Sequence, residues 1–233
     1  MAWRAITWYQ RLVTFPPGAD RVDGDAGRFG TTAFYAALGR AFVVMCAVIP
    51  VLAMIELLDQ ATGGQLDLLF GIRPRAIAGI DGIILAPLVH ADFNHLVANA
   101  APMVLLGTFV LAAGTRRFLL ATLLIAVVSG LGVWFTTPSN YLVVGASGVI
   151  FGWLGLLLVR GIVEHSLWNL GVTLVVGLLY GWQVFALLPS ERQVSWQGHL
   201  FGFIGGAVAA ILFRERPARA RISDAPEPSP TEP

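Results

Sequence analysis

Residues 196–213, WQGHLFGFIGGAVAAILF, form an apolar run in which His199 is the one ionisable side chain. About 20 apolar residues cross the roughly 30 Å hydrocarbon core of a bilayer as a helix, so this run predicts a membrane-spanning helix. Gly198, Gly202 and Gly206 recur every four residues, which would let a second helix approach closely. A histidine in such surroundings needs a polar partner or must remain neutral. The run therefore predicts a packed helix bundle with a functional polar group inside it.

The rest of the chain has a similar composition. Of its 233 residues, 56% are hydrophobic and only 12% are charged, which is far from the average of soluble domains. The predicted spans cover residues 41–57, 94–113, 117–136, 145–161, 167–188 and 196–213. Residues 58–93 are apolar but punctuated by Gly and Pro, which indicates a structured loop. We expect an all-α polytopic membrane protein, a bundle of six transmembrane helices with a partly embedded first loop.

The arginines predict how this bundle is oriented. All fifteen basic residues are Arg; twelve lie on one side of the predicted spans, and Arg73, Arg75 and Arg192 lie on the other. Cytoplasmic segments are enriched in basic residues, so we expect both termini in the cytoplasm. The expected division is a cytoplasmic or interfacial N-terminal segment (1–40), a six-helix domain (41–213) and a disordered, Pro-rich cytoplasmic tail (214–233).

Two classes of function are excluded by charge and by ligand chemistry. A formal net charge of +1 gives no field that would attract nucleic acid. Three histidines at one depth could hold zinc, but the chain has no HExxH pattern to support a metalloprotease, so we expect no metal site.

The topology places four polar residues at one depth. Spans two, four and six all run inward from the outer face, and their first turns contain His95 and Asn99, Ser147, and His199, respectively. Neutral His199 could take the proton from Ser147 as the serine oxygen attacks a carbonyl carbon. Glu191, the nearest acid in the sequence, is expected in a loop. The pattern therefore predicts an intramembrane serine hydrolase with a Ser147–His199 dyad instead of a triad.

Neighbouring residues suit supporting roles in the same site. His95 and Asn99 are four apart on one helix face and could donate hydrogen bonds to an oxyanion, together with the Ser147 amide at a helix N-terminus. Phe151, one turn after Ser147, could stack on His199. Gly145 and Gly148 begin a glycine stripe on span four that matches the stripe of Gly198 and Gly202 on span six. A close contact between the two spans would follow.

Plainer interpretations exist for each of these residues. The glycines, taken alone, fit ordinary helix packing, and Asn99 fits an interhelical hydrogen bond. Phe151 fits lipid or core packing equally well. His90, in the first loop, fits a structural hydrogen bond.

These motifs, in this order, resemble the rhomboid family of intramembrane serine proteases over roughly residues 70–213. The resemblance rests on GIRPR in the first loop, on HxxxxHxxxN at His90, His95 and Asn99, on GxSG at 145–148, and on GHxxGxxxG at 198–206. It implies a six-helix core, Ser147 as nucleophile, His199 as base and an oxyanion site at His95 and Asn99. It also implies that no cofactor is needed. The Trp-Arg pair that some bacterial members have in the first loop is absent here, and Phe151 stands where Tyr is common.

The resemblance also implies a substrate class. Substrates would be single-span membrane proteins whose helix unwinds near the outer face, and the protein would reside in a bacterial plasma membrane. Two other classes stay open: a catalytically silent rhomboid-like scaffold that binds membrane clients, and a small transporter or channel whose buried histidines relay protons.

Overall fold

The structure, a computed structural model, describes residues 29–164, 166–189 and 195–214. Within these ranges the chain forms helices and no β-strand, only one isolated bridge between Ile72 and Val143. The expected all-α class is confirmed. Most of the predicted N-terminal segment and of the predicted tail lies outside the described residues, so the division into three regions stays a prediction.

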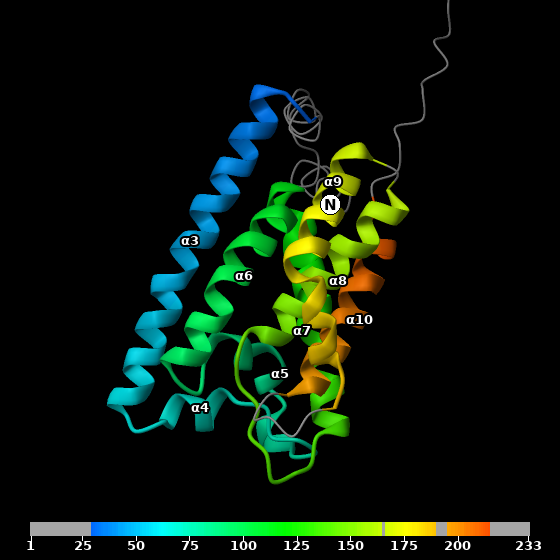
Figure 1. The fold of residues 1–233 in the computed structure, drawn as a ribbon. Helices are drawn as coiled ribbons and strands as arrows, with labels where there is room; N and C mark the ends of the chain where they lie inside the picture. The colour runs from blue at the N-terminus through cyan, green and yellow to red at the C-terminus, as the bar shows by residue number, and fades with distance from the viewer. Residues whose placement is uncertain (1–28, 165, 190–194, 215–233) are drawn as a thin grey trace, which may run out of the picture.

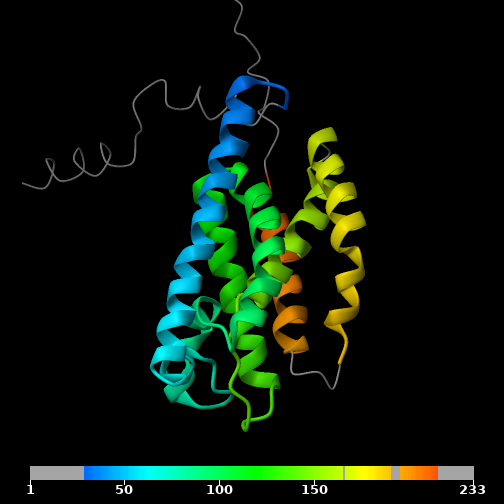
Figure 2. The ribbon, with the colours of Figure 1, turned by 60° about the vertical axis from the view of Figure 1, so that its left-hand side comes forward.

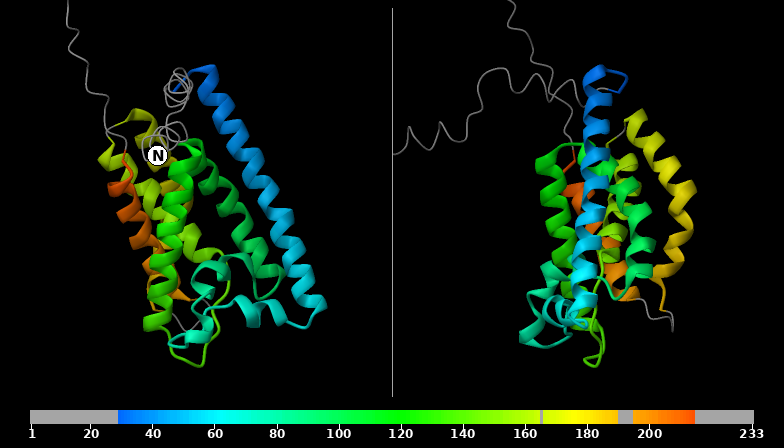
Figure 3. Two further views of the ribbon diagram at one scale, coloured as in Figure 1. Left: turned by 180° about the vertical axis from the view of Figure 1, so that it is seen from behind. Right: turned by 90° about the vertical axis from the view of Figure 1, so that its left-hand side faces the viewer.

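The helices form one bundle (Figures 1, 2 and 3). In Figure 2, α3 and α9 lie at its opposite edges. In chain order they are α3 (Thr32–Ala61), α4 (Gln65–Phe70), the 3-10 helix η1 (Ile77–Gly79), α5 (Gly82–Leu85), the 3-10 helix η2 (Ala86–Leu88), α6 (Phe93–Ala112), α7 (Thr115–Thr136), α8 (Ser147–Val163), α9 (Leu167–Tyr180), the 3-10 helix η3 (Gly181–Leu187) and α10 (Trp196–Leu212).

Four segments are long and apolar enough to cross a membrane: α3, α6, α7 and the continuous stretch Leu167–Leu187 formed by α9 and η3. The helices α8 and α10 have 17 residues each, which is the lower limit of a spanning helix, at about 17 residues. The count of six spans therefore stays a prediction.

The first predicted span differs most in extent from its helix, and the fifth differs in helix type. The first helix begins at Thr32 instead of residue 41, because the Thr31 hydroxyl caps it by accepting a hydrogen bond from Phe34 N at 3.1 Å and because Phe34 is buried. Arg40, which falls within this helix, is exposed on its outer face. The fifth predicted span is not one α-helix, because it tightens into a 3-10 helix at Gly181.

The closest helix contact is between α8 and α10. A Cβ atom added at Gly202 would fall on the carbonyl oxygen of Gly148, and one added at Gly206 would fall on that of Gly152. Side chains at these positions would force the helices apart. The predicted close contact between the two glycine stripes is therefore present, and it fixes the relative position of everything at the start of both helices.

The loop between α3 and α6 packs against the segment that leads into α8. The main chains of Ile72 and Val143 exchange two hydrogen bonds, of 2.8 and 3.0 Å, and Gly145 N donates to the carbonyl of Ala86 at 2.9 Å. Figure 1 shows α4 and α5 at the end of the bundle where α6, α8 and α10 begin. We call this the loop end. The loop thus covers the first turns of the helices that contain the polar residues.

A buried charge cluster ties helices together at the opposite end. Glu164, which caps α8, binds Arg117 of α7 and accepts hydrogen bonds from Arg160 Nε at 2.6 Å and from Asn169 Nδ2 of α9 at 2.7 Å. Arg160 and Asn169 are buried. Although burial raises the pKa of Glu164, the charges and hydrogen bonds of the two arginines outweigh that effect and lower it.

Candidate active site

Ser147 is the first residue of α8, and the turn before it depends on glycine. Gly145 has a φ of +110°, in the region that side chains rarely adopt. A Cβ at Gly145 would also fall on the ring of His95. Glycine therefore allows both the turn and the close approach of α6. The ring of His95 lies against Gly145, two residues before the serine.

His199 lies in the first turn of α10. The helix is capped by Ser195, whose Oγ accepts a hydrogen bond from Gly198 N at 3.2 Å. His199 is only 4% exposed, yet both of its ring nitrogens have partners. Nε2 lies 3.0 Å from Ser147 Oγ, and Nδ1 lies 3.1 Å from the carbonyl oxygen of Ala186 in η3. Residues that are 52 positions apart in the sequence thus meet inside the bundle.

The carbonyl contact determines which nitrogen of His199 holds the proton. A carbonyl oxygen only accepts hydrogen bonds, so Nδ1 must be the donor. In the neutral ring Nε2 then has the free lone pair and accepts the hydrogen of the Ser147 hydroxyl. This is the arrangement in which a histidine can act as a base toward the serine.

An aromatic ring supports the imidazole on one face. The Phe151 ring lies parallel to His199, with centroids 4.0 Å apart and an angle of 13° between the planes. Phe151 is buried and lies one turn after Ser147 on α8. The stacking expected for this pair is therefore present in the structure.

His95 and Asn99 lie one turn apart on α6, at the loop end. Asn99 is 6% exposed, and its Nδ2 has no acceptor among the residues that the structure describes. Buried amide groups almost always have hydrogen-bond partners. Asn99 Nδ2 is therefore a buried donor that is free to bind a group entering the site. The interhelical hydrogen bond considered for this nitrogen is not formed with any described residue.

Similarity to known proteins identifies the family of this chain. Residues 80–216, more than half of the chain, match the family model described as Rhomboid domain. The chain belongs to the rhomboid family. Rhomboid proteases act on membrane-protein substrates within the bilayer, and this rhomboid is a multi-pass membrane protein.

Its relatives range from uncharacterized proteins to named proteases. The chain is 42% identical over 184 residues to an uncharacterized protein of Mycobacterium tuberculosis, covering 74% of this chain and 75% of the relative. It is 30% identical over 165 residues to Bacillus subtilis YdcA, named as a rhomboid protease, covering 69% and 77%. Identity to rhomboid protease GluP of the same bacterium is 28% over 167 residues, covering 67% of this chain and 31% of GluP.

The surroundings of His90 in this rhomboid differ from those expected from the sequence. It is 1% exposed, and neither ring nitrogen has a hydrogen-bond partner among the described residues. The structural hydrogen bond expected for His90 in the loop is therefore not formed with any of these residues. Instead the ring packs edge-on against His95, with centroids 5.2 Å apart. Burial, together with the nearby His95, lowers the pKa of His90 to about 4, so the ring is neutral at neutral pH and supports His95 by contact.

Ser129 of α7 also belongs to the surroundings of the site, and the sequence interpretation missed it. Its Oγ donates to the carbonyl of Gly198 at 2.9 Å, next to His199. The same oxygen occupies the space that a Cβ at Gly148 would need. One hydroxyl group thus joins α7, α8 and α10 beside the dyad. The available signal was a polar Ser129-Gly130 pair in the middle of an otherwise apolar span.

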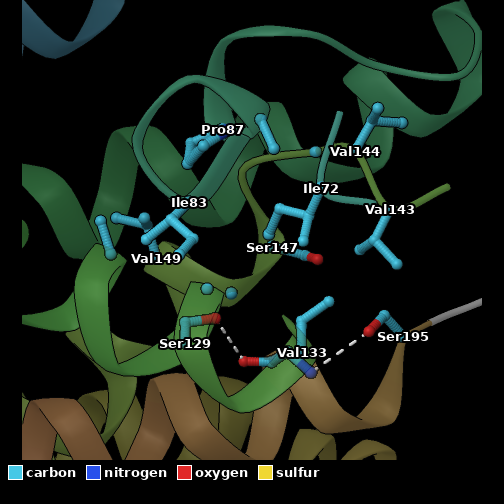
Figure 4. A pocket seen from close by; sticks show the side chains of 16 residues that line it. Ile72, Ile83, Pro87, Ser129, Val133, Val143, Val144, Ser147, Val149 and Ser195 are labelled. Atoms are coloured by element: carbon cyan, nitrogen blue, oxygen red, sulfur yellow. Dashed lines mark hydrogen bonds between the residues drawn. The ribbon is translucent and has the colours of Figure 1, made fainter. Parts of the chain in front are cut away.

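A cavity opens beside the nucleophile of this rhomboid. It has an empty volume of about 380 Å³, including its open mouth. Figure 4 shows Ser147 among apolar side chains that line it. These are Ile72, Ile83, Val133, Val143, Val144 and Val149. The serine oxygen therefore lies beside an open, mainly apolar hollow.

The described part of the chain contains neither a metal-binding cluster nor a carboxylate bonded to His199 that would complete a catalytic triad. There, no three His, Cys, Asp or Glu side chains are grouped closely enough to hold a metal ion. Glu191, the nearest acid before His199 in the sequence, lies outside the described residues.

Proposed function

We propose that this rhomboid is an intramembrane serine endopeptidase that cleaves single-span membrane proteins near the outer face, using a Ser147–His199 dyad. One observation carries the proposal: Ser147 Oγ lies 3.0 Å from His199 Nε2, within the 2.6–3.2 Å reach, roughly, of a nucleophile and its base. Burying an ionisable side chain in an apolar bundle is costly, so such residues usually mark a functional site.

The reaction would proceed in two steps. In the first, Ser147 Oγ attacks the carbonyl carbon of the scissile peptide bond while His199 Nε2 takes the hydroxyl proton. The tetrahedral intermediate collapses, the C–N bond breaks, and the imidazolium returns the proton to the leaving amine. In the second step, water gives a proton to His199 and attacks the acyl ester. The carboxylic acid product leaves, and Ser147 regains its proton.

The oxyanion of the intermediate would be stabilised by donors from two helices. Asn99 Nδ2 is buried without an acceptor in the described protein, and His95 lies against Gly145 at the start of α8. The main-chain N–H of Ser147, as the first residue of α8, adds a donor at the positive end of a helix dipole. Preorganised donors of this kind stabilise a developing negative charge.

The depth of the site agrees with a six-span arrangement. With α8 and α10 counted as spans, each rises about 25 Å, which is shorter than the hydrocarbon core, so their first turns would lie below the surface. With both termini cytoplasmic, the loop end would face outward, toward the space outside a bacterial plasma membrane. Water would then reach Ser147 from the outer face. No cofactor has a role in this mechanism.

The proposal is tested by cleavage in proteoliposomes. The purified protein is reconstituted with a fluorescent single-span substrate that has small, helix-breaking residues near its outer end. We expect cleavage by the wild type and by Ser139→Ala, a control in an exposed turn, and none by Ser147→Ala or His199→Ala. A folded wild type that captures such helices without cutting them would instead identify a silent client-binding scaffold. Cleavage that persists in Ser147→Ala would overturn the proposed nucleophile.

A further inference from the structure

The Nδ1 side of His199 faces the main chain of η3 and no carboxylate among the residues described. The acceptor is the carbonyl oxygen of Ala186, 3.1 Å from Nδ1. In a serine triad an acidic side chain at this position holds the imidazole in the correct tautomer. Here a neutral peptide group is in that position.

The sequence explains why this carbonyl is available. In a 3-10 helix each carbonyl accepts from the N–H three residues later, as Phe185 O does from Leu188 N at 3.3 Å. The corresponding donor for Ala186 would be residue 189, which is a proline and has no N–H. A proline also drives the residue before it into an extended conformation, and Leu188 has φ −87° and ψ 149°. Pro189 thus ends η3 and leaves the Ala186 carbonyl without a partner in its own helix.

Packing holds this carbonyl against α10. Ala186 and Leu187 are partly buried and pack against the main hydrophobic core, whereas Trp182, Phe185 and Leu188 on the other side of the same segment are exposed. Figure 2 shows α9 at the edge of the bundle. Its inner neighbour is α8, and the segment that contacts α10 is η3, which follows α9. A short apolar contact therefore positions the acceptor at the edge of an otherwise exposed segment.

We propose that the Ala186 carbonyl, kept free by Pro189, is the positioning group of the catalytic histidine and replaces the carboxylate of a triad. This inference rests on the proposed protease function. A neutral acceptor selects the Nδ1–H tautomer without placing a further charge in apolar surroundings, where an ionised carboxylate would be costly. When His199 becomes an imidazolium during the reaction, the same hydrogen bond becomes charge-assisted and stronger. Any movement of η3 away from α10 would remove this support.

The most direct test makes the Ala186 carbonyl a weaker hydrogen-bond acceptor. Replacing residue 187 by its α-hydroxy acid converts the peptide bond after Ala186 into an ester, whose carbonyl is a poorer acceptor. The matched control is the ester one bond earlier, which weakens the Phe185 carbonyl and also removes one N–H from η3. We expect kcat to fall roughly 5- to 20-fold with KM nearly unchanged, and the control ester to cost less than about 2-fold. Equal losses in the two esters would overturn the proposal.

A spectroscopic measurement decides the question independently of cleavage. With ¹⁵N-labelled histidine, NMR identifies which ring nitrogen of His199 is protonated. We expect Nδ1–H in the wild type and a growing fraction of Nε2–H in the ester variant and in Pro189→Ala, which restores a competing N–H. Pro138→Ala, in an exposed turn, should leave the tautomer unchanged. If the wild type does not cleave but shows Nδ1–H, the protease proposal fails while this geometry stands; a wild type with Nε2–H would overturn the inference even if cleavage is observed.

Discussion

The ring of Phe151 lies flat on the imidazole of His199, with centroids 4.0 Å apart and planes 13° apart. One face of the base is therefore fixed by a side chain from the same helix as the nucleophile. We expect Phe151→Leu to lower kcat about 10-fold, because aliphatic contact fills the space without holding the ring plane, at a cost of about 1.4 kcal/mol. Phe151→Tyr should retain most of the activity. Steady-state kinetics with a membrane substrate would check both, and equal activity of Leu and Phe at this position would contradict the stacking role.

Asn99 offers a sharper test of the oxyanion site. Its Nδ2 has no acceptor among the described residues, so removing it should cost little stability. We expect Asn99→Ala to lower kcat by roughly 10²-fold, as the loss of one oxyanion donor does elsewhere, with a small change in the thermal unfolding midpoint. A variant that is as active as the wild type, or one that loses activity only because it unfolds, would argue for a structural role instead.

The contact between α8 and α10 predicts unequal effects for two glycine substitutions. Gly202→Ala would place a methyl group on the Gly148 carbonyl, so we expect a loss of about 1 to 3 kcal/mol in the free energy of unfolding. Gly171→Ala in α9 meets no heavy atom within 4 Å and should be neutral or slightly stabilising. Unfolding titrations in mixed detergent micelles would compare the two. A Gly202→Ala protein as stable as the control would mean that the helices do not approach this closely.

The Glu164 cluster predicts a dependence of stability on pH. The arginines lower the pKa of Glu164 below its ordinary value of 4.5, so the ionised form stabilises the fold. That contribution is complete above pH 4.5 and is lost as the pH falls through the lower pKa of the folded state.

Glu164→Gln isolates this contribution from that of the other carboxyl groups. At neutral pH the variant should be less stable than the wild type by roughly 3 kcal/mol, because a partner of buried arginines has lost its charge. The difference between the two unfolding midpoints should shrink as the pH is lowered below 4.5. A difference that stays constant with pH would contradict the assigned ionisation.

The sequence predicted those features that depend on side-chain pattern and topology. The depth argument brought Ser147 and His199 together, and the glycine repeats predicted the close pair of helices. Features that depend on main-chain groups or on tertiary burial were not predictable in this way. The Ala186 carbonyl has no sequence signature except Pro189. The ring of His90 packs against His95, and the expected hydrogen bond is not formed with any described residue.

The most direct test of the account is covalent labelling of the nucleophile. The detergent-purified wild type is treated with a serine-reactive fluorophosphonate, and mass spectrometry locates the adduct, alongside Ser147→Ala, His199→Ala and the control Ser139→Ala. The account predicts modification of Ser147 in the wild type and in the control, and no labelling in the two dyad variants. Equal labelling of Ser147 in His199→Ala, or no labelling of a folded wild type, would contradict an activated Ser147–His199 dyad.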